Sequence, residues 1–347
     1  MRIHRLRLIL SATAALALVV CGGSVNAGTI IVNDSFADGN RFATGTSGSD
    51  IETNFFATST GSAIEDDNDD GIGAGAVGLV SGTSGRQIHA VFPSTTLAAA
   101  GDKIQSSVTF TTPAVSGNNL FSQADFDALD PAVQDGASLS AFPTTGDDLR
   151  IGLFSSNSAG LNLSTDLSNN SSTQIPELLL AGYAVELDVE PSGSASTTDI
   201  QLREYLLANA TGNLLGTNTG SSSVATDGST GQYFFQPSTQ YELVQSYTLN
   251  AAGGLDVAVT FIEAGVTLGT LTSTETAPTT LEFSILALGA SSEAFGLSND
   301  AGDPENGIDI NNVTIHTEIV EATAVPEPGT LSILFGGMTL AMLRRRR

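Results

Sequence analysis

The segment Glu186-Leu187-Asp188-Val189-Glu190 places three carboxylates at alternating positions. On a β-strand alternate residues share one face, so the three side chains would point the same way. Neighbouring carboxylates would lie about 6–7 Å apart along the strand, and the two glutamates about 13 Å apart. Retaining glycosidases hold their two catalytic carboxyl groups about 5–5.5 Å apart, so in such a site the side chains of Glu186 as the nucleophile and Glu190 as the acid/base would have to converge. The competing interpretation is the polar face of a half-buried strand.

The segment is similar to the Glu-x-Asp-x-Glu signature of laminarinase- and lichenase-type hydrolases, which are jelly rolls. The resemblance implies a glucan-cleaving site at Glu186 and Glu190. The clefts of those enzymes stack sugars on tryptophan, however, and this chain contains none. The motif also stands alone, without the rest of that family's pattern. We therefore expect a protein that is not an enzyme and keep a glycoside hydrolase as the second alternative.

The segment Asp66-Asp67-Asn68-Asp69-Asp70-Gly71 fits the start of a calcium loop. Asp66, Asn68 and Asp70 would supply oxygen ligands at alternate positions, and the glycine permits the sharp turn. An EF-hand would need Glu at the twelfth position, where Val77 stands. The pattern therefore leaves two hypotheses open, a free-standing Asp-rich calcium loop and a solvated acidic turn. Calcium is the one cofactor that the sequence suggests.

A second acidic cluster lies near the C-terminal end of the body of the chain. Jelly-roll lectins hold a structural calcium in comparable places, which implies a site between the terminal strands. The cluster comprises Asn299, Asp300, Asp303, Glu305, Asn306 and Asp309, with Asp34 as a further ligand.

The charge of the chain excludes several classes of function. Three basic residues lie in the first seven positions and four at the end, so five basic and thirty-seven acidic residues stand between them, a formal charge of −32. Such a surface repels nucleic acid and attracts divalent cations. The single cysteine, Cys21, lies in the N-terminal segment, which excludes disulfides and thiolate chemistry from the rest. His89 and His316 each fall within a strand pattern, and we expect them to be structural.

The N-terminus has the three regions of a secretory signal peptide. Arg2, Arg5 and Arg7 form a basic region, and an apolar stretch runs from residue 8 to 20. Val25-Asn26-Ala27 then supplies the small-residue cleavage pattern. We expect signal peptidase to cut between Ala27 and Gly28, which predicts export across the inner membrane.

The C-terminus combines a stiff motif, an apolar segment and a basic end. The motif is Val325, Pro326, Glu327, Pro328, Gly329 and Thr330, and the basic end is Arg344, Arg345, Arg346 and Arg347. Between them, residues 331–343 are thirteen residues, which as a helix would cover roughly 20 Å, less than a hydrocarbon core of about 30 Å. The sequence therefore predicts a short hydrophobic helix that is held in the membrane transiently.

This tail resembles the PEP-CTERM sorting signal of bacterial exopolysaccharide-producing systems. In that family an intramembrane exosortase reads the Pro-Glu-Pro motif and removes the anchor. The resemblance implies an exosortase-type partner and a final location at the cell surface or in the extracellular matrix.

Between the two ends, apolar residues recur with a period of two, which is typical of strands with one buried face. Glu263-Ala264-Gly265 predicts a hairpin turn, and a register change at Asn311-Asn312 predicts a β-bulge. One short helix is expected at 122–129 and loops at 44–48, 157–173, 192–198 and 218–231. The predicted strands are 29–32, 87–92, 103–111, 149–154, 182–190, 200–206, 241–249, 255–262, 266–271, 281–288 and 308–317.

Three segments look like landmarks of jelly-roll domains, including concanavalin-like and carbohydrate-binding sandwiches. They are residues 33–39, 149–154 and 308–315. Together with the many short strands, they predict an all-β fold, a jelly-roll-type β-sandwich of antiparallel strands.

These observations predict three parts: a signal peptide (1–27), a β-sandwich domain (28–322) and a sorting tail (323–347). The expected function is that of an exported, non-enzymatic surface or matrix protein with a structural or binding role near exopolysaccharide. The first alternative is a calcium-dependent carbohydrate-binding module.

Overall fold

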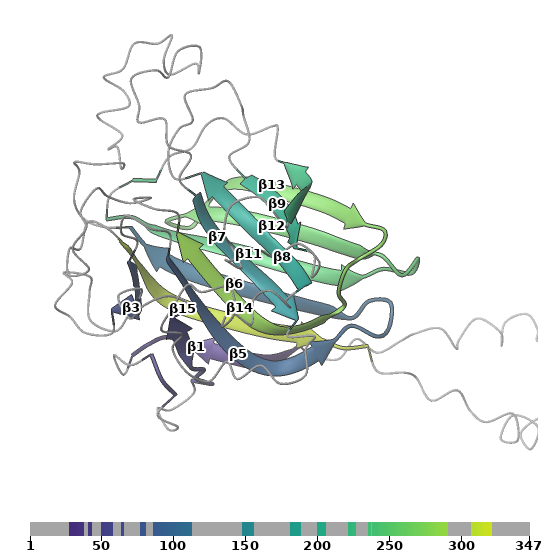
Figure 1. Ribbon diagram of the computed structural model, residues 1–347, viewed down its shortest axis with the longest axis horizontal. Helices are drawn as coiled ribbons and strands as arrows, with labels where there is room; N and C mark the ends of the chain where they lie inside the picture. Colours follow the sequence, from purple (N-terminus) through teal and green to yellow (C-terminus); the bar gives the residue numbers. More distant parts are fainter. Residues whose placement is uncertain are drawn as a thin grey trace, which may run out of the picture. The chain divides into compact units, whose positions relative to one another are not determined.

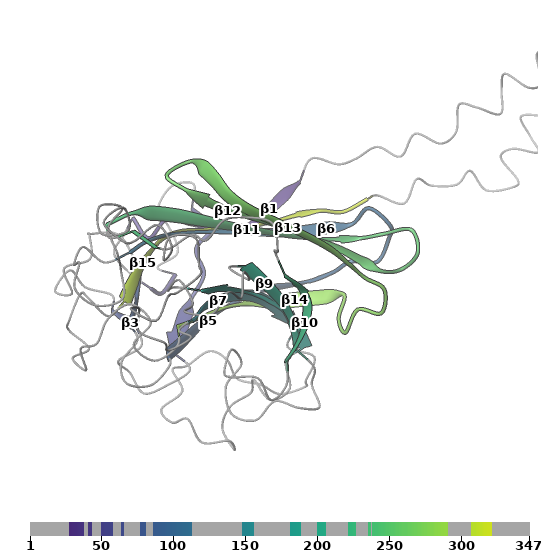
Figure 2. The same ribbon diagram turned by 90° about the horizontal axis from the view of Figure 1, so that it is seen from above.

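The computed structural model describes residues 28–37, 41–43, 50–57, 64–65, 77–80, 86–112, 148–155, 181–188, 200–205, 221–226, 235–236, 238–290 and 307–320. All regular structure in these residues is β-strand, and it forms two antiparallel sheets (Figure 1). Figure 2 shows the two sheets as stacked layers, so the fold is a β-sandwich. Gly28–Glu318 forms one compact unit that contains every strand.

The first sheet, sheet A, has the order β13-β12-β11-β6-β15-β4-β3, and β1 also pairs with β15. Its strands are β1 (Thr29–Asp34), β3 (Ile64–Glu65), β4 (Val77–Val80), β6 (Lys103–Thr111), β11 (Gln240–Leu249), β12 (Leu255–Glu263), β13 (Val266–Glu275) and β15 (Gly307–Glu318).

The second sheet, sheet B, has the order β10-β9-β8-β7-β14-β5-β2. Its strands are β2 (Phe55–Ala57), β5 (Arg86–Thr96), β7 (Asp148–Ser155), β8 (Ala181–Asp188), β9 (Ile200–Tyr205), β10 (Ser221–Thr226) and β14 (Glu282–Ala290).

Over β6, β11 and β12, sheet A has one buried and one solvent-facing side, as the sequence pattern of these strands requires. Exposure alternates residue by residue along β6 and β11. The hairpin between β12 and β13 turns at Ala264 and Gly265, which have φ values of 45° and 85°. Glycine adopts this left-handed conformation without steric cost, so the predicted turn is confirmed.

Sheet B is different, because its central strands are buried on both sides. Every residue of β14 after Glu282 is buried, and the described side chains of β8 are buried as well. The inner side belongs to the main core, while the outer side carries a second cluster. That cluster consists of Phe154, Ala184, Tyr205, Ile285 and Ala287.

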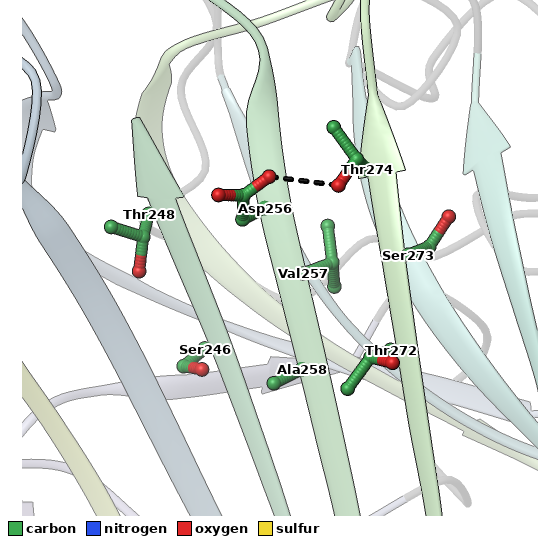
Figure 3. Close-up of a pocket in the computed structure, with 8 residues that line it drawn as sticks. All are labelled: Ser246, Thr248, Asp256, Val257, Ala258, Thr272, Ser273 and Thr274. Atoms are coloured by element: carbon green, nitrogen blue, oxygen red, sulfur yellow. Dashed lines mark hydrogen bonds between the residues drawn. The ribbon is translucent and has the colours of Figure 1, made fainter. Parts of the chain in front are cut away.

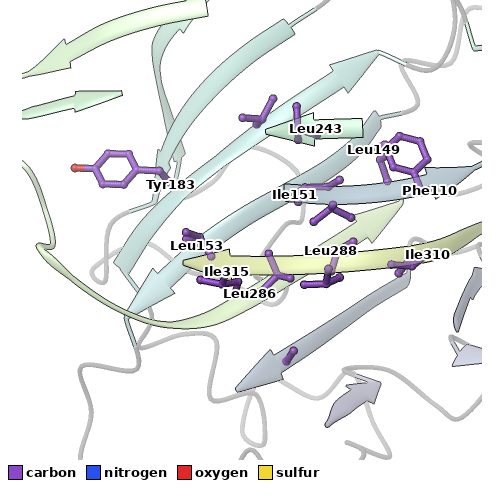
Figure 4. Packing of buried hydrophobic residues seen from close by; sticks show 14 of the residues in the cluster. Phe110, Leu149, Ile151, Leu153, Tyr183, Leu243, Leu286, Leu288, Ile310 and Ile315 are labelled. Carbon is purple, nitrogen blue, oxygen red and sulfur yellow. The ribbon is translucent and has the colours of Figure 1, made fainter. Parts of the chain in front are cut away.

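The main core fills the space between the two sheets (Figure 4). Leu149, Ile151 and Leu153 of β7 belong to the same buried cluster as Ile310 and Ile315 of β15. Burying one such aliphatic side chain contributes about 1.5–3 kcal/mol, so this cluster is the main source of the sandwich's stability.

Inside this apolar core, one polar connection joins the two sheets. Gln245 of β11 is fully buried, and its Nε2 donates a hydrogen bond to the carbonyl oxygen of Ile151 at 3.1 Å. The hydroxyl of Tyr247 donates to Gln245 Oε1 at 2.9 Å. Because the nitrogen and the oxygen of the Gln245 amide each have a hydrogen-bond partner, the burial of this polar side chain is tolerated. The connection fixes the position of sheet A against sheet B.

All eleven predicted strands are confirmed, with each end within four residues of the predicted one. The bulge is also confirmed, because the pairing of β15 with β6 shifts between Ile310 and Asn312. The loop prediction for 218–231 is wrong in part, since β10 lies within it and pairs with β9. Its sequence, Ser-Ser-Ser-Val-Ala-Thr, has no apolar alternation, and its backbone pairing with β9 is what identifies it as a strand.

Several predictions concern residues outside the described ranges. They are the signal peptide, the helix at 122–129, the calcium loop with Asp66, Asn68 and Asp70, and the sorting tail. Within the described ranges, no helix is long and apolar enough to cross a membrane.

Candidate functional site

Glu186, the predicted nucleophile, lies in β8 between two arginines. Arg150 is its cross-strand neighbour in β7, and Arg150 Nε lies 2.7 Å from Glu186 Oε2. From β9, Arg203 Nη2 donates to Glu186 Oε1 at 2.7 Å, and Arg203 Nε lies 2.7 Å from Oε2. Arg203 therefore lies against both carboxylate oxygens and makes one charge-assisted hydrogen bond, from Nη2.

This environment gives Glu186 a structural role. Its exposure is only 6%, and both carboxylate oxygens already face guanidinium groups. A glycosidase nucleophile must reach the anomeric carbon of a bound sugar, and this carboxylate has no free oxygen within the described residues to do so. The interpretation as a half-buried strand also needs correction, because β8 is buried on its outer side too. Glu190 lies outside the described residues.

Asp34 was proposed as a further calcium ligand of the second acidic cluster, but its carboxylate accepts hydrogen bonds from backbone N–H groups. Its Oδ1 accepts a hydrogen bond from Phe36 N at 3.0 Å, and its Oδ2 accepts one from Thr53 N at 3.2 Å. The first bond stabilises the positive φ of Phe36 (51°), so the carboxylate shapes the chain after β1. Asp309 is buried in β15, and the other members of the cluster lie outside the described residues.

The two histidines within the described residues lie in different surroundings. His89 is 2% exposed and packs with its ring centroid 5.7 Å from that of Phe56. His316 Nε2 lies 3.8 Å from Glu318 Oε1 on the outer side of sheet A. Among the described residues, no group of three or more His, Asp or Glu side chains is arranged to hold a metal ion.

A shallow hollow lies on the solvent-facing side of sheet A, over β11, β12 and β13 (Figure 3). Two rows of side chains cross the three strands, as the pairing requires. One row is Thr248, Asp256 and Thr274, and the other is Ser246, Ala258 and Thr272. The small side chain of Ala258 stands between two larger hydroxyl residues, which leaves the floor of the hollow low at its centre.

The spacing of these rows follows from sheet geometry. Neighbouring strands are about 4.8 Å apart, and alternate residues on one strand are about 6.7 Å apart. The hollow has a volume of about 450 Å³ and is open to solvent. Its lining is dominated by hydroxyl groups, whereas pockets for drug-sized ligands and cofactors are mostly apolar and enclosed. This hollow therefore suits a hydrated, hydroxyl-rich ligand that lies along the sheet.

Asp256 is the one charged residue among those that line the hollow. Asn250 Nδ2 and Thr274 Oγ1 both donate to its Oδ1, at 3.0 and 2.8 Å. These two hydrogen bonds hold the pKa of Asp256 below its usual value, Asn250 contributing most. Within the described residues no donor is bound to Oδ2, so the carboxylate presents one open, ionised oxygen.

The turn between β11 and β12 holds this carboxylate in place. Asn250 Oδ1 accepts hydrogen bonds from Ala252 N and Gly254 N, at 3.0 and 2.9 Å. Gly253 has a φ of 84°, which permits the tight turn. The same asparagine therefore closes the turn with its oxygen and fixes Asp256 with its nitrogen.

Sequence reasoning did not find this hollow, although part of the signal is visible. The alternation of Thr270, Thr272 and Thr274 shows that β13 presents hydroxyls on one side. What the sequence does not show is the register that places Asp256 and Ala258 beside them.

No protein-family model matches the chain, and no curated protein matches it. Among solved structures, the chain is similar to the VIP36 exoplasmic/lumenal domain in its Ca2+/Man2-bound form. The identity is 12%, the TM-score 0.40, and the match covers 82% of this chain and 88% of that one. The Emp47p carbohydrate recognition domain gives 10% identity, a TM-score of 0.39 and coverage of 85% and 98%. Basic winged bean lectin with Tn-antigen gives 8% identity and a TM-score of 0.38, and the match covers 84% of this chain and 98% of that one. The sandwich itself follows from the strand pairing described above.

Proposed function

We propose that the protein is an exported, non-enzymatic surface or matrix protein whose jelly-roll-type sandwich binds extracellular polysaccharide. The observation that carries this proposal is the open hollow on sheet A, with its hydroxyl lining and one fixed carboxylate. Sugars present hydroxyl groups that both donate and accept hydrogen bonds, and this lining offers partners for both.

The lining also indicates a polymer as the ligand. None of the residues around the hollow is aromatic, so a sugar would be held by hydrogen bonds that exchange with water and contribute only about 0.5–1.5 kcal/mol each. A single sugar unit would bind weakly. A polysaccharide carries many equivalent units, and dense protein on a surface would engage several of them at once.

Export and sorting belong to the same proposal. Signal peptidase would cut between Ala27 and Gly28, and an exosortase-type enzyme would act at Pro326-Glu327-Pro328. Replacement of these three residues by alanine is expected to leave full-length protein in the membrane fraction. Normal processing of that variant, seen by immunoblot, would remove the sorting part of the proposal.

A calcium-dependent carbohydrate-binding module is the alternative. It is supported by the Asp66, Asn68 and Asp70 spacing and would place sugar recognition near a bound ion. A glycoside hydrolase is disfavoured by the surroundings of Glu186, whose two oxygens are engaged by arginines.

The proposal is tested by filling the hollow. Ala258→Leu adds a side chain to its centre without touching the core, because Ala258 is exposed. Retardation of the full chain, kept in mild detergent, is measured in native gels that contain soluble polysaccharide. The variant is expected to lose retardation, whereas Thr270→Leu, on the same side of sheet A outside the hollow, is expected to keep it. Equal retardation of the two variants would exclude the hollow as the binding site.

A further inference from the structure

We infer that the hollow on sheet A selects polysaccharides that carry protonated amino groups, a property that rests on the proposed polysaccharide binding. A glucosamine-type polymer offers the hydroxyls that the lining can pair with, together with an ammonium group for the open oxygen of Asp256. The inference depends on the geometry of that carboxylate and on the charges around it.

The carboxylate is oriented before any ligand arrives. Both of its hydrogen bonds end on Oδ1, from Asn250 and Thr274, and Oδ2 accepts none from the described residues. Because the turn holds Asn250 through two further bonds, little side-chain entropy remains to be lost when a cation binds.

Among the described residues on this side of the sheet, no positive charge lies directly beside Asp256. Thr248 of β11 pairs with Asp256 on one side and with Lys103 of β6 on the other. Lys103 is therefore two strands away from Asp256, a distance of about 10 Å. Its Nζ lies 3.3 Å from Glu318 Oε1, on the side away from the hollow. Glu242 of β11 adds a further negative charge to this side of the sheet. An anionic polymer such as a polyuronate would be repelled, and a neutral polymer would leave the carboxylate unpaired.

The size of the effect follows from the exposure of the site. One exposed ion pair raises affinity by about two- to fivefold, and added salt screens it. The inference therefore predicts modest selectivity between otherwise identical sugars, and no selectivity at high salt.

The test compares two short oligomers of equal length, one of glucosamine and one of N-acetylglucosamine, which differ in charge. Binding to the full chain in mild detergent is measured by titration calorimetry at low and high salt. We expect the glucosamine oligomer to bind about two- to fivefold more tightly at low salt. Asp256→Asn should erase this difference, because the amide oxygen can still accept both hydrogen bonds while the charge is lost.

Glu242→Gln is the matched control, since it removes one negative charge from the same side of sheet A outside the hollow. It should keep the preference for glucosamine. If both variants weaken glucosamine binding equally, attraction is due to net charge and the inference is wrong. If both oligomers bind equally and Asp256→Asn has no effect, charge selection fails while polysaccharide binding stands. If neither oligomer nor any polysaccharide binds, the proposed function fails and the inference fails with it.

Discussion

At the scale of single residues, Glu186 shows why spacing within one strand is weak evidence for catalysis. The Glu-x-Asp-x-Glu pattern correctly predicts a strand, but the chemistry of Glu186 is decided by two arginines that lie 36 and 17 residues away in sequence. A sequence does not reveal this register, because it depends on which strands pair. The same limit applies to Asp256 and its neighbours.

Removal of the Glu186 carboxylate is expected to destabilise the protein strongly. Glu186→Ala leaves two guanidinium groups beside each other in a buried place, which typically costs about 3–5 kcal/mol. The free energy of unfolding is measured by urea denaturation. Glu242→Ala, a half-buried glutamate on sheet A, serves as the control and should cost about 1 kcal/mol. Equal small losses for both variants would contradict the buried ion-pair arrangement.

Three buried tyrosines predict how stability depends on alkaline pH. Burial raises the pKa of Tyr183 to about 12, and it raises the pKa of Tyr241 and Tyr247 well above the ordinary value. The folded protein therefore holds protons that the unfolded chain releases above about pH 10. The stabilising contribution is complete below that pH and is lost as the pH rises further.

The measurement is tyrosinate absorbance together with circular dichroism during alkaline titration. We expect the ionisation of these three tyrosines to coincide with unfolding, and Tyr247→Phe to make the loss of stability with pH less steep. Full ionisation of all tyrosines in a protein that keeps its β-sheet signal would contradict the burial of these side chains.

At the scale of elements, an apolar pattern of sufficient length predicts a strand, whether its residues alternate or run continuously, and strands without such a pattern are not predicted. Lys103–Thr111 has the predicted bounds because its polar and apolar residues alternate strictly. Ser221–Thr226 was missed because no apolar pattern marks it, and Val77–Val80 was missed because its four residues carry too short a pattern. Gln245 is the reverse case, a polar residue where alternation predicts an apolar one.

Gln245 also gives a test of how the two sheets are held together. Gln245→Leu removes the hydrogen bond to Ile151 O and leaves the hydroxyl of Tyr247 without its acceptor. An unpaired buried polar group costs about 1–3 kcal/mol, so the free energy of unfolding should fall by that amount. Ser246→Ala, the next residue on the opposite side of β11, should change it by less than about 0.5 kcal/mol. A neutral Gln245→Leu substitution would show that apolar packing alone joins the sheets.

At the scale of the whole molecule, the large negative charge attracts divalent cations, and the acidic loop gives calcium a candidate place to bind and stabilise the fold. If Asp66, Asn68 and Asp70 bind calcium, the ion raises the free energy of unfolding by about 2.7 kcal/mol at one hundred times its dissociation constant. The thermal midpoint of the full chain should rise with calcium and fall again with a chelator. Asp66→Asn combined with Asp70→Asn should abolish the shift, and Asp256→Asn should retain it. An unchanged midpoint for the unmodified protein would favour the solvated acidic turn.

Polysaccharide is expected to bind over β11, β12 and β13, and the strands around Glu186 are expected to form no sugar cleft. Hydroxyl-radical footprinting of the full chain, with and without a soluble polysaccharide, tests this expectation most directly. We expect protection of peptides within Gln240–Glu275 and unchanged oxidation of peptides within Ala181–Asp188. Protection centred on Ala181–Asp188, accompanied by shortening of the polysaccharide, would contradict it.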